Sequence, residues 1–308
     1  MPKAKSRKKI EGAIIRVKET LTNTCLEDFL GNKKTREEVV DIYLNIVNKD
    51  FLKSFKVFPD KSFLFYGPPG NGKTFAIKCL AGEIGKNKGQ IYVVVPYEIG
   101  KYGTAYINLG AVKMNTFFET GKELSQKENV KGVIYLFDEC DVIMGKRENF
   151  SSHKEDNKVL EILMKHLQRI HDEDTNEYIF FTTNLKEEID LASIRSGRMD
   201  KTVVFENPDK NARFELFKKE IERINENAGY DVIYKYNLDH LVEESSEFNC
   251  CDCIEIPKRA LKNTLLKIMK RRSRNMVFPV YLTNKNLLEE IKRQKERNSK
   301  IKKMGFLV

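Results

Sequence analysis

Up to residue 206, the chain alternates short apolar runs with longer segments in which apolar side chains recur at helical spacing. The short runs are continuously apolar rather than alternating with polar residues, which is typical of strands buried on both faces of a parallel sheet. We therefore predict an α/β fold with a five-stranded parallel sheet flanked by helices. The predicted strands are residues 62–66, 90–95, 133–137, 178–183 and 202–205, and the predicted helices include 35–53, 111–125 and 157–170.

The β pattern ends at Asn207, and the rest of the chain has helical spacing, which predicts a small all-helical domain. Near the other end, residues 6–21 predict a basic amphipathic helix that packs on its own domain or docks on a membrane or a partner. The helices predicted after Asn207 are residues 211–225, 237–244, 252–271 and 284–297. The expected divisions are a basic extension at 1–24, an α/β domain at 25–206, a helical domain at 207–284, and a basic helix and tail at 285–308.

The net charge of +10 is unevenly distributed along the chain. The first ten residues carry five Lys and Arg, and residues 258–274 carry eight without one Asp or Glu. Residues 285–303 are also basic. Two interpretations are open: an anionic partner such as nucleic acid or a membrane surface, or a lysine-rich helical surface facing solvent.

No apolar run has the length of a transmembrane helix, and the basic start is not followed by the apolar stretch of a secretory signal. We therefore expect an intracellular, cytoplasmic protein. The six cysteines, three of them between Cys250 and Cys253, do not form a disulfide framework and favour reduced thiols. A zinc site at Cys250–Cys253, with His240 as a fourth ligand, is the alternative.

A glycine, four further residues and then Gly-Lys-Thr occupy residues 67–74, between a predicted strand and a predicted helix. This is the P-loop, or Walker A, pattern, in which glycines let backbone N–H groups approach phosphates and the following helix points its positive end at them. Lys73 is expected to reach the β- and γ-phosphates of ATP, and Thr74 to bind Mg²⁺. The expected nucleotide-binding residues of this segment are Gly67, Pro68, Pro69, Gly70, Asn71, Gly72, Lys73, Thr74 and Phe75.

Two carboxylates, Asp138 and Glu139, follow the apolar run 133–137. This is the Walker B arrangement, because a parallel strand delivers its carboxyl end to the ligand crevice. Asp138 is expected to orient Mg²⁺, and Glu139 to polarise the attacking water. The two motifs together predict a P-loop NTPase that hydrolyses ATP.

With these motifs the sequence resembles the AAA+ ATPases, specifically the AAA family proper, through most of its length. The segment Asp28–Gly31 is similar to the family's opening segment, whose backbone lies beside the adenine. Asn184 is similar to the sensor-1 amide, which contacts the γ-phosphate and the attacking water. The resemblance also implies that the helical domain acts as a lid. The opening-segment residues assigned to the nucleotide are Asp28, Leu30 and Gly31.

The segment 189–200 looks like the family's second region of homology. The resemblance implies that Arg195 and Arg198 project into the ATP of a neighbouring subunit, where a guanidinium accelerates phosphoryl transfer by about 10³–10⁵. It therefore implies a homo-oligomeric, hexameric ring. Tyr102 and Tyr106 approximate the aromatic residue with which the family's pore loop grips polypeptide.

One departure from the family is Asn249–Asp252, which stands where most members have small residues at the start of a lid helix. A sensor-2 function is therefore in doubt. The expected function is a Mg-ATP-hydrolysing ring that remodels, unfolds or translocates protein through a central pore. The alternative is a nucleic-acid-associated ATPase, such as a repair or loading factor, motivated by the basic run 258–274. Since about 24 residues precede the family-like segment, we expect no folded N-terminal recognition domain.

Overall fold

The structure is a computed structural model that describes residues 24–88, 91–96, 109–128, 130–141, 153–184, 199–271 and 279–303. Its internal contacts divide the chain into two compact units. The first unit comprises Met1–Phe29, Lys34–Gly67 and Lys73–Phe205. The second comprises Leu30–Lys33, Pro68–Gly72 and Glu206–Val308. The predicted helix at residues 6–21 lies outside the described residues.

The first unit is built on a five-stranded sheet in the order β2-β3-β4-β1-β5, and every neighbouring pair is parallel. The prediction of a five-stranded parallel sheet is therefore confirmed. Burial explains why the apolar runs were continuous, since all seven residues of β4 are buried. The strands are β1 (Ser62–Tyr66), β2 (Ile91–Pro96), β3 (Val130–Phe137), β4 (Glu177–Thr183) and β5 (Lys201–Val204).

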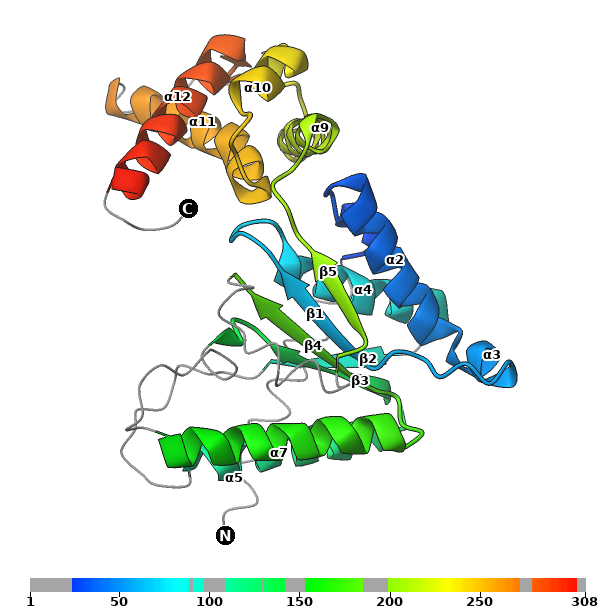
Figure 1. Cartoon of the computed structure of the whole chain (residues 1–308). Coiled ribbons are helices and arrows are strands. Elements are labelled where there is room, and N and C mark those ends of the chain that lie inside the picture. Colours follow the sequence, from blue (N-terminus) through cyan, green and yellow to red (C-terminus); the bar gives the residue numbers. More distant parts are fainter. Residues whose placement is uncertain are drawn as a thin grey trace. The chain divides into compact units, whose positions relative to one another are not determined.

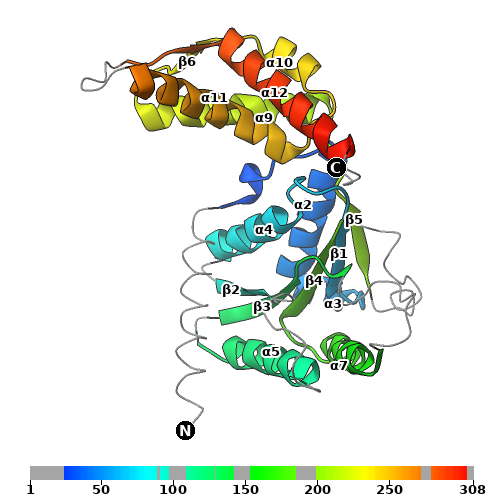
Figure 2. The same ribbon diagram turned by 90° about the vertical axis from the view of Figure 1, so that its left-hand side faces the viewer.

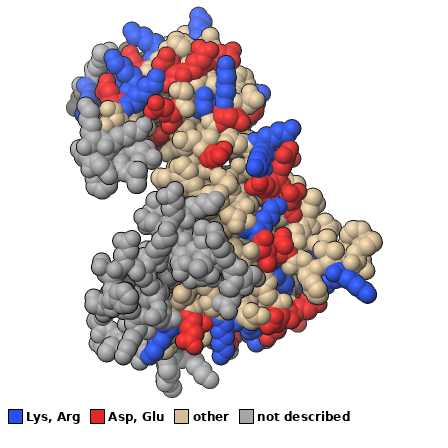
Figure 3. Space-filling model, in the orientation of Figure 1, with Lys and Arg blue, Asp and Glu red and all other residues tan. Residues whose placement is uncertain are grey.

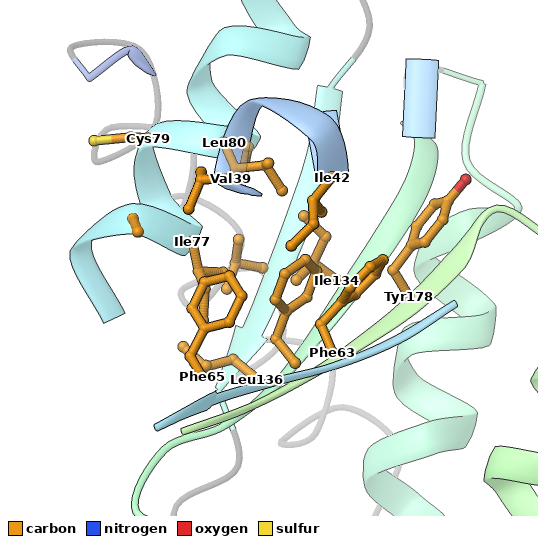
Figure 4. Packing of buried hydrophobic residues seen from close by; sticks show 14 of the residues in the cluster. Val39, Ile42, Phe63, Phe65, Ile77, Cys79, Leu80, Ile134, Leu136 and Tyr178 are labelled. Carbon is orange, nitrogen blue, oxygen red and sulfur yellow. The ribbon is translucent and has the colours of Figure 1, made fainter. Parts of the chain in front are cut away.

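Helices cover both faces of this sheet (Figures 1 and 2). On one face, α2 (Lys33–Val47) and α4 (Lys73–Lys88) pack apolar side chains on β1, as Figure 4 shows for Ile42, Phe63 and Ile77. On the other face lie α5 (Leu109–Ser125) and α7 (His153–Asp172). Because both faces are covered, the carboxyl edge of the sheet is where polar side chains can gather.

The predicted helix at residues 35–53 is two helices in the structure. A 3-10 helix, η1 (Leu26–Asp28), precedes α2, and α2 is followed by α3 (Lys49–Ser54). The break falls at Asn48, whose side-chain Nδ2 donates to the Leu44 carbonyl oxygen over 3.0 Å. An asparagine amide competes in this way with the helical backbone, which is why such residues favour helix ends.

The second unit is mainly helical, as predicted, with one addition. A two-stranded parallel pair, β6 (Ile233–Lys235) and β7 (Leu282–Thr283), lies among the helices. The sequence pattern missed it because strands of three and two residues are too short to show a period. The helices of this unit are α9 (Lys210–Ala228), α10 (Leu238–Glu244), α11 (Cys250–Arg271) and α12 (Asn284–Lys303).

The helices of the second unit share one apolar core. Phe217 of α9, Leu241 of α10, Ile256 of α11 and Leu287 of α12 are all buried in it. The first helix begins where its sequence indicates, since the Asp209 carboxylate accepts from the Ala212 N–H over 2.8 Å and caps α9. None of the helices in the described ranges combines the length and apolar content that crossing a membrane requires.

Candidate functional site

Three strands of the first unit end side by side at the carboxyl edge of the sheet. The strand order places β4 between β1 and β3. Gly67 follows β1, Asp138 follows β3 and Asn184 follows β4. Parallel strands bring their carboxyl ends to one edge, so residues far apart in the sequence meet there.

Lys73, the first residue of α4, is the centre of this cluster. It is 8% exposed, and its Nζ donates to the Gly67 carbonyl oxygen over 2.6 Å and to Asn184 Oδ1 over 2.8 Å. Burial lowers the pKa of the Lys73 ammonium, and the nearby Asp138, Asp141 and Glu139 carboxylates oppose that shift. The arrangement presents a cation whose oxygen partners an anionic ligand can replace.

The Asp138 carboxylate accepts hydrogen bonds from two hydroxyl groups. Its Oδ1 accepts from Thr74 Oγ1 over 2.8 Å and from Thr182 Oγ1 over 2.5 Å. A carboxylate and a hydroxyl are hard oxygen ligands of the kind that Mg²⁺ prefers. The donor set of Thr74 and Asp138 therefore fits a magnesium ion.

Glu139 has an unusual backbone conformation for a residue other than glycine. Its φ is +54°, in the left-handed region, and its N–H donates to Thr182 Oγ1 over 3.0 Å. The next residue, Cys140, donates its N–H to the Thr182 carbonyl oxygen over 2.8 Å. The turn is thus anchored on β4 while the Glu139 side chain stays exposed, and backbone strain of this kind is common at functional sites.

Gly67 occupies a position that only glycine fits. Its φ is +141°, and a Cβ built there would lie 2.1 Å from the Phe205 carbonyl oxygen. Its N–H donates to the Thr183 carbonyl oxygen over 3.3 Å. The chain can therefore leave β1 close to β4 and β5 only because this residue lacks a side chain.

The tip of the loop, Pro68–Gly72, belongs to the second unit, where it contacts the start of α11. The Gly70 carbonyl oxygen accepts from the Cys251 N–H over 2.9 Å, and Asn71 Oδ1 accepts from the Cys250 N–H over 3.2 Å. Asn249 Nδ2 donates to the Pro69 carbonyl oxygen over 3.3 Å. The loop tip is thus hydrogen-bonded to the first turn of a helix about 180 residues further along the chain.

Several residues predicted for the site have other surroundings. The Asp28 carboxylate accepts from the Cys25 N–H over 2.9 Å and so caps η1, and Leu30 packs on the apolar core of the second unit. Gly31 belongs to the second unit, and Phe75 is 41% exposed in the first turn of α4. Four further predicted residues lie outside the described ranges, namely Tyr102, Tyr106, Arg195 and Arg198.

Three polar side chains of the first unit contact the site although they were not among the predicted site residues. Thr182 joins Asp138 to the Glu139 backbone, and Thr183 Oγ1 donates to Asp141 Oδ1. The sequence does contain a signal for these residues. Thr182 and Thr183 are two polar residues at the end of an otherwise apolar strand, and Asp141 is a third acid in the segment after β3. Hydroxyls in such a position can hold neighbouring carboxylates in place.

The zinc alternative at Cys250–Cys253 is wrong for the described part of the chain, which contains no group of three or more His, Cys, Asp and Glu able to hold a metal ion. Cys250 and Cys253 are buried in the apolar core of the second unit instead. Burial raises the pKa of the Cys250 thiol to about 12, which keeps it protonated.

The chain is similar in sequence to known ATPases. Residues 63–207 match a family described as "ATPase family associated with various cellular activities (AAA)". An "ATP-dependent zinc metalloprotease FtsH" of Helicobacter pylori is 30% identical over 214 residues, covering 66% of this chain and 30% of the relative. An "AAA ATPase forming ring-shaped complexes" of Corynebacterium diphtheriae is 28% identical over 225 residues, covering 70% and 43%. A "Proteasome-activating nucleotidase" of Pyrococcus abyssi is 31% identical over 205 residues, covering 66% and 48%. The chain therefore spans less than half the length of each of these relatives.

Proposed function

Because the chain belongs to the AAA family of ATPases, we propose that it hydrolyses Mg-ATP and uses that reaction to remodel or unfold proteins. The proposal rests on two hydrogen bonds at the carboxyl edge of the sheet. Lys73 donates to Asn184 over 2.8 Å, and Thr74 donates to Asp138 over 2.8 Å. A cation, an amide, a hydroxyl and a carboxylate are the groups that phosphoryl transfer to water requires.

Each side chain has a distinct task in this reaction. Lys73 exchanges its Gly67 contact for phosphate oxygens, and the start of α4 adds its positive dipole end. Thr74 and Asp138 would hold Mg²⁺, which would supply positive charge to neutralise the phosphates. Glu139 takes a proton from the attacking water, and Asn184 orients that water and the terminal phosphate. The Thr182 hydroxyl fixes the position of the Asp138 carboxylate relative to the Glu139 backbone, because it is hydrogen-bonded to both.

The second half of the site is proposed to come from a neighbouring copy of the chain. Arg195 and Arg198 are the candidates, because an arginine supplied in trans stabilises charge on the transferred phosphoryl group. A relative is described as forming ring-shaped complexes, which supports assembly of this chain into a ring. The proposed ring is a hexamer.

The proposed substrate is protein. Relatives include a metalloprotease and a proteasome-activating nucleotidase, and Tyr102 and Tyr106 are the candidates for gripping polypeptide in the pore. The basic run on α11 gives less support to nucleic acid, because Lys258 is 3.1 Å from Glu255 and Lys267 is 4.0 Å from Glu289. Figure 3 shows acidic and basic side chains adjoining one another on the visible face of this unit.

Stimulation of ATP hydrolysis tests the substrate class. The rate of phosphate release is measured with an unfolded polypeptide, with single-stranded DNA and with RNA at several salt concentrations. A response to polypeptide alone supports the proposal. A steeply salt-dependent response to DNA or RNA instead supports a nucleic-acid-associated ATPase and contradicts protein remodelling.

Mixing two inactive variants tests the shared site. Arg198→Ala lacks the trans-acting arginine, whereas Glu139→Gln retains it but lacks the base. When the two are mixed, an Arg198→Ala subunit beside a Glu139→Gln subunit regains hydrolysis, so activity returns in part. Mixed rings that stay inactive, or a chain that remains monomeric with ATP, would contradict the proposal, and Arg195→Ala mixed in the same way decides which arginine acts.

A further inference from the structure

We propose that Asn71 is a positioning residue that sets nucleotide affinity by fixing the loop tip to the first turn of α11 and to Asn207. The inference rests on the proposed function, since it concerns the same nucleotide site. Asn71 is 3% exposed although it lies at the tip of a loop. A buried amide is stable only when its polar atoms have partners, so its contacts are part of the fold.

Both ends of the Asn71 amide are occupied within the second unit. Oδ1 accepts from the Cys250 N–H over 3.2 Å, and Nδ2 donates to Asn207 Oδ1 over 2.9 Å. A backbone N–H can only donate, so the Cys250 contact fixes which end of the amide is oxygen. Asn71 Nδ2 must then face Asn207, which has to present its own oxygen.

Asn207 is itself held in place by Asn32. The Asn207 carbonyl oxygen accepts from Asn32 Nδ2 over 3.1 Å, and Asn32 Oδ1 accepts from the Asp209 N–H over 2.7 Å. The Asn32 side chain therefore joins the backbone of Asn207 to the backbone of Asp209, which caps α9. A residue anchored in this way can act as a fixed support for the loop.

The peptide geometry of the loop shows what this support achieves. In a planar trans peptide the carbonyl and the following N–H point in opposite directions. The Pro69 and Gly70 carbonyls point to Asn249 Nδ2 and the Cys251 N–H. The N–H groups of Gly70 and Asn71 are consequently turned away from α11. Backbone N–H groups of such loops are the phosphate donors, so the contacts with α11 pre-orient two of them.

Glycine at position 70 makes this close approach feasible. Its φ is +80°, and a Cβ built there would lie 2.6 Å from Asn249 Nδ2. The positive φ therefore favours glycine at this point, and the missing Cβ leaves room for the Asn249 side chain. Removing the Asn71 side chain leaves the glycine in place but frees the tip to adopt other orientations, which lowers nucleotide affinity by loss of pre-organisation.

The test measures the affinity of the full chain for N-methylanthraniloyl-ADP with Mg²⁺, together with kcat and KM for ATP. Asn71→Ala is expected to weaken binding about tenfold and to raise KM, with kcat at saturating ATP within about twofold of wild type. Asn207→Ala is expected to weaken binding about threefold. The double variant should bind no more weakly than Asn71→Ala, because Asn207 acts through Asn71.

Two controls separate positioning from general stability. Asn225→Ala removes another asparagine of the second unit whose amide bonds both the N–H and the carbonyl of Ile233, so it lowers the melting temperature without altering affinity. Asn207→Asp keeps an acceptor for Asn71 Nδ2 and should retain more affinity than Asn207→Ala.

The outcomes distinguish the two levels of the proposal. Wild-type affinity in Asn71→Ala, or losses that simply add in the double variant, would overturn the positioning role while leaving the ATPase proposal intact. A wild-type chain that binds no adenine nucleotide would overturn both.

Discussion

Lys73 and Asn184 are hydrogen-bonded over 2.8 Å although 111 positions separate them in the sequence. The contact joins the first residue of α4 to the residue that follows β4. In the structure this amide and the Gly67 carbonyl oxygen share the ammonium of a largely buried lysine. The lysine proposed to bind the nucleotide and the residue proposed to sense it are thus in direct contact, and single substitutions can test the two roles separately.

Asn184→Ala removes one partner of Lys73 without adding charge. We expect ATP affinity to change by less than about threefold, because the backbone donors of the loop remain. We expect kcat to fall by about 100-fold, since the amide acts on the water and on developing charge in the transition state. Steady-state kinetics with a thermal melt of the variant checks this, and an unchanged kcat would remove the sensor role.

Lys73→Ala should abolish nucleotide binding. Burial lowers the pKa of Lys73, so the charged side chain costs free energy in the folded state. The melting temperature without nucleotide should therefore equal or exceed that of the wild type. MgADP raises the melting temperature of the wild type but not of the variant, because a ligand stabilises only a protein that binds it. Lys78→Ala, on the same helix, is the matched control and should still respond to MgADP.

Glu139→Gln should separate binding from hydrolysis. The amide has the shape of the carboxylate but cannot take a proton, so hydrolysis falls by about 10²–10⁴-fold while binding is retained. Phosphate release and nucleotide affinity are measured on the same sample. A variant that still turns over at the wild-type rate would show that another group acts as the base.

Glu139→Gly should also be inactive but more stable. A φ of +54° costs a residue with a Cβ about 1 kcal/mol, and glycine adopts it freely. We expect the free energy of unfolding to rise by up to about 1 kcal/mol in denaturant titrations, whereas Glu139→Gln leaves it unchanged. Equal stability of the two variants would mean that the turn carries no strain.

His166 is expected to make stability depend on pH. It is 8% exposed, stacks on Phe118 with ring centroids 4.2 Å apart, and burial lowers its pKa to about 4. Between pH 6.5 and 4 the unfolded chain binds a proton that the folded chain does not, so stability falls as the pH is lowered through that range. The loss approaches about 1.4 kcal/mol per pH unit from this group.

His166→Phe retains a ring for the stack with Phe118 and removes the titrating group. The difference in unfolding free energy between variant and wild type should therefore change with pH between 6.5 and 4, in favour of the variant at the acidic end. Denaturant titrations of both proteins at about pH 7 and about pH 5 measure it. Parallel pH profiles would contradict the assignment.

The sequence predicted the sheet well because its strands are buried on both faces. Continuous apolar runs such as residues 133–137 are too short for a buried helix and too apolar for a surface loop, and the paired motifs at their ends identified Lys73 and Asp138. The sequence did not predict the break at Asn48, because a single asparagine leaves no periodic signal. It did not predict the pairing of β6 with β7 either, because five strand residues are too few to show a period. The contact between Asn71 and Cys250 depends on tertiary structure alone, which no local pattern records.

The fit between the loop tip and α11 provides a built-in position for a spectroscopic label. Cys251, whose N–H bonds the Gly70 carbonyl oxygen, is exposed, whereas Cys79, Cys140, Cys250 and Cys253 are buried and Cys25 is half-buried. A maleimide dye offered in limiting amount should attach first to Cys251, after replacement of Cys25 by serine. Its emission would then follow the loop tip through each nucleotide state without a cysteine having to be introduced.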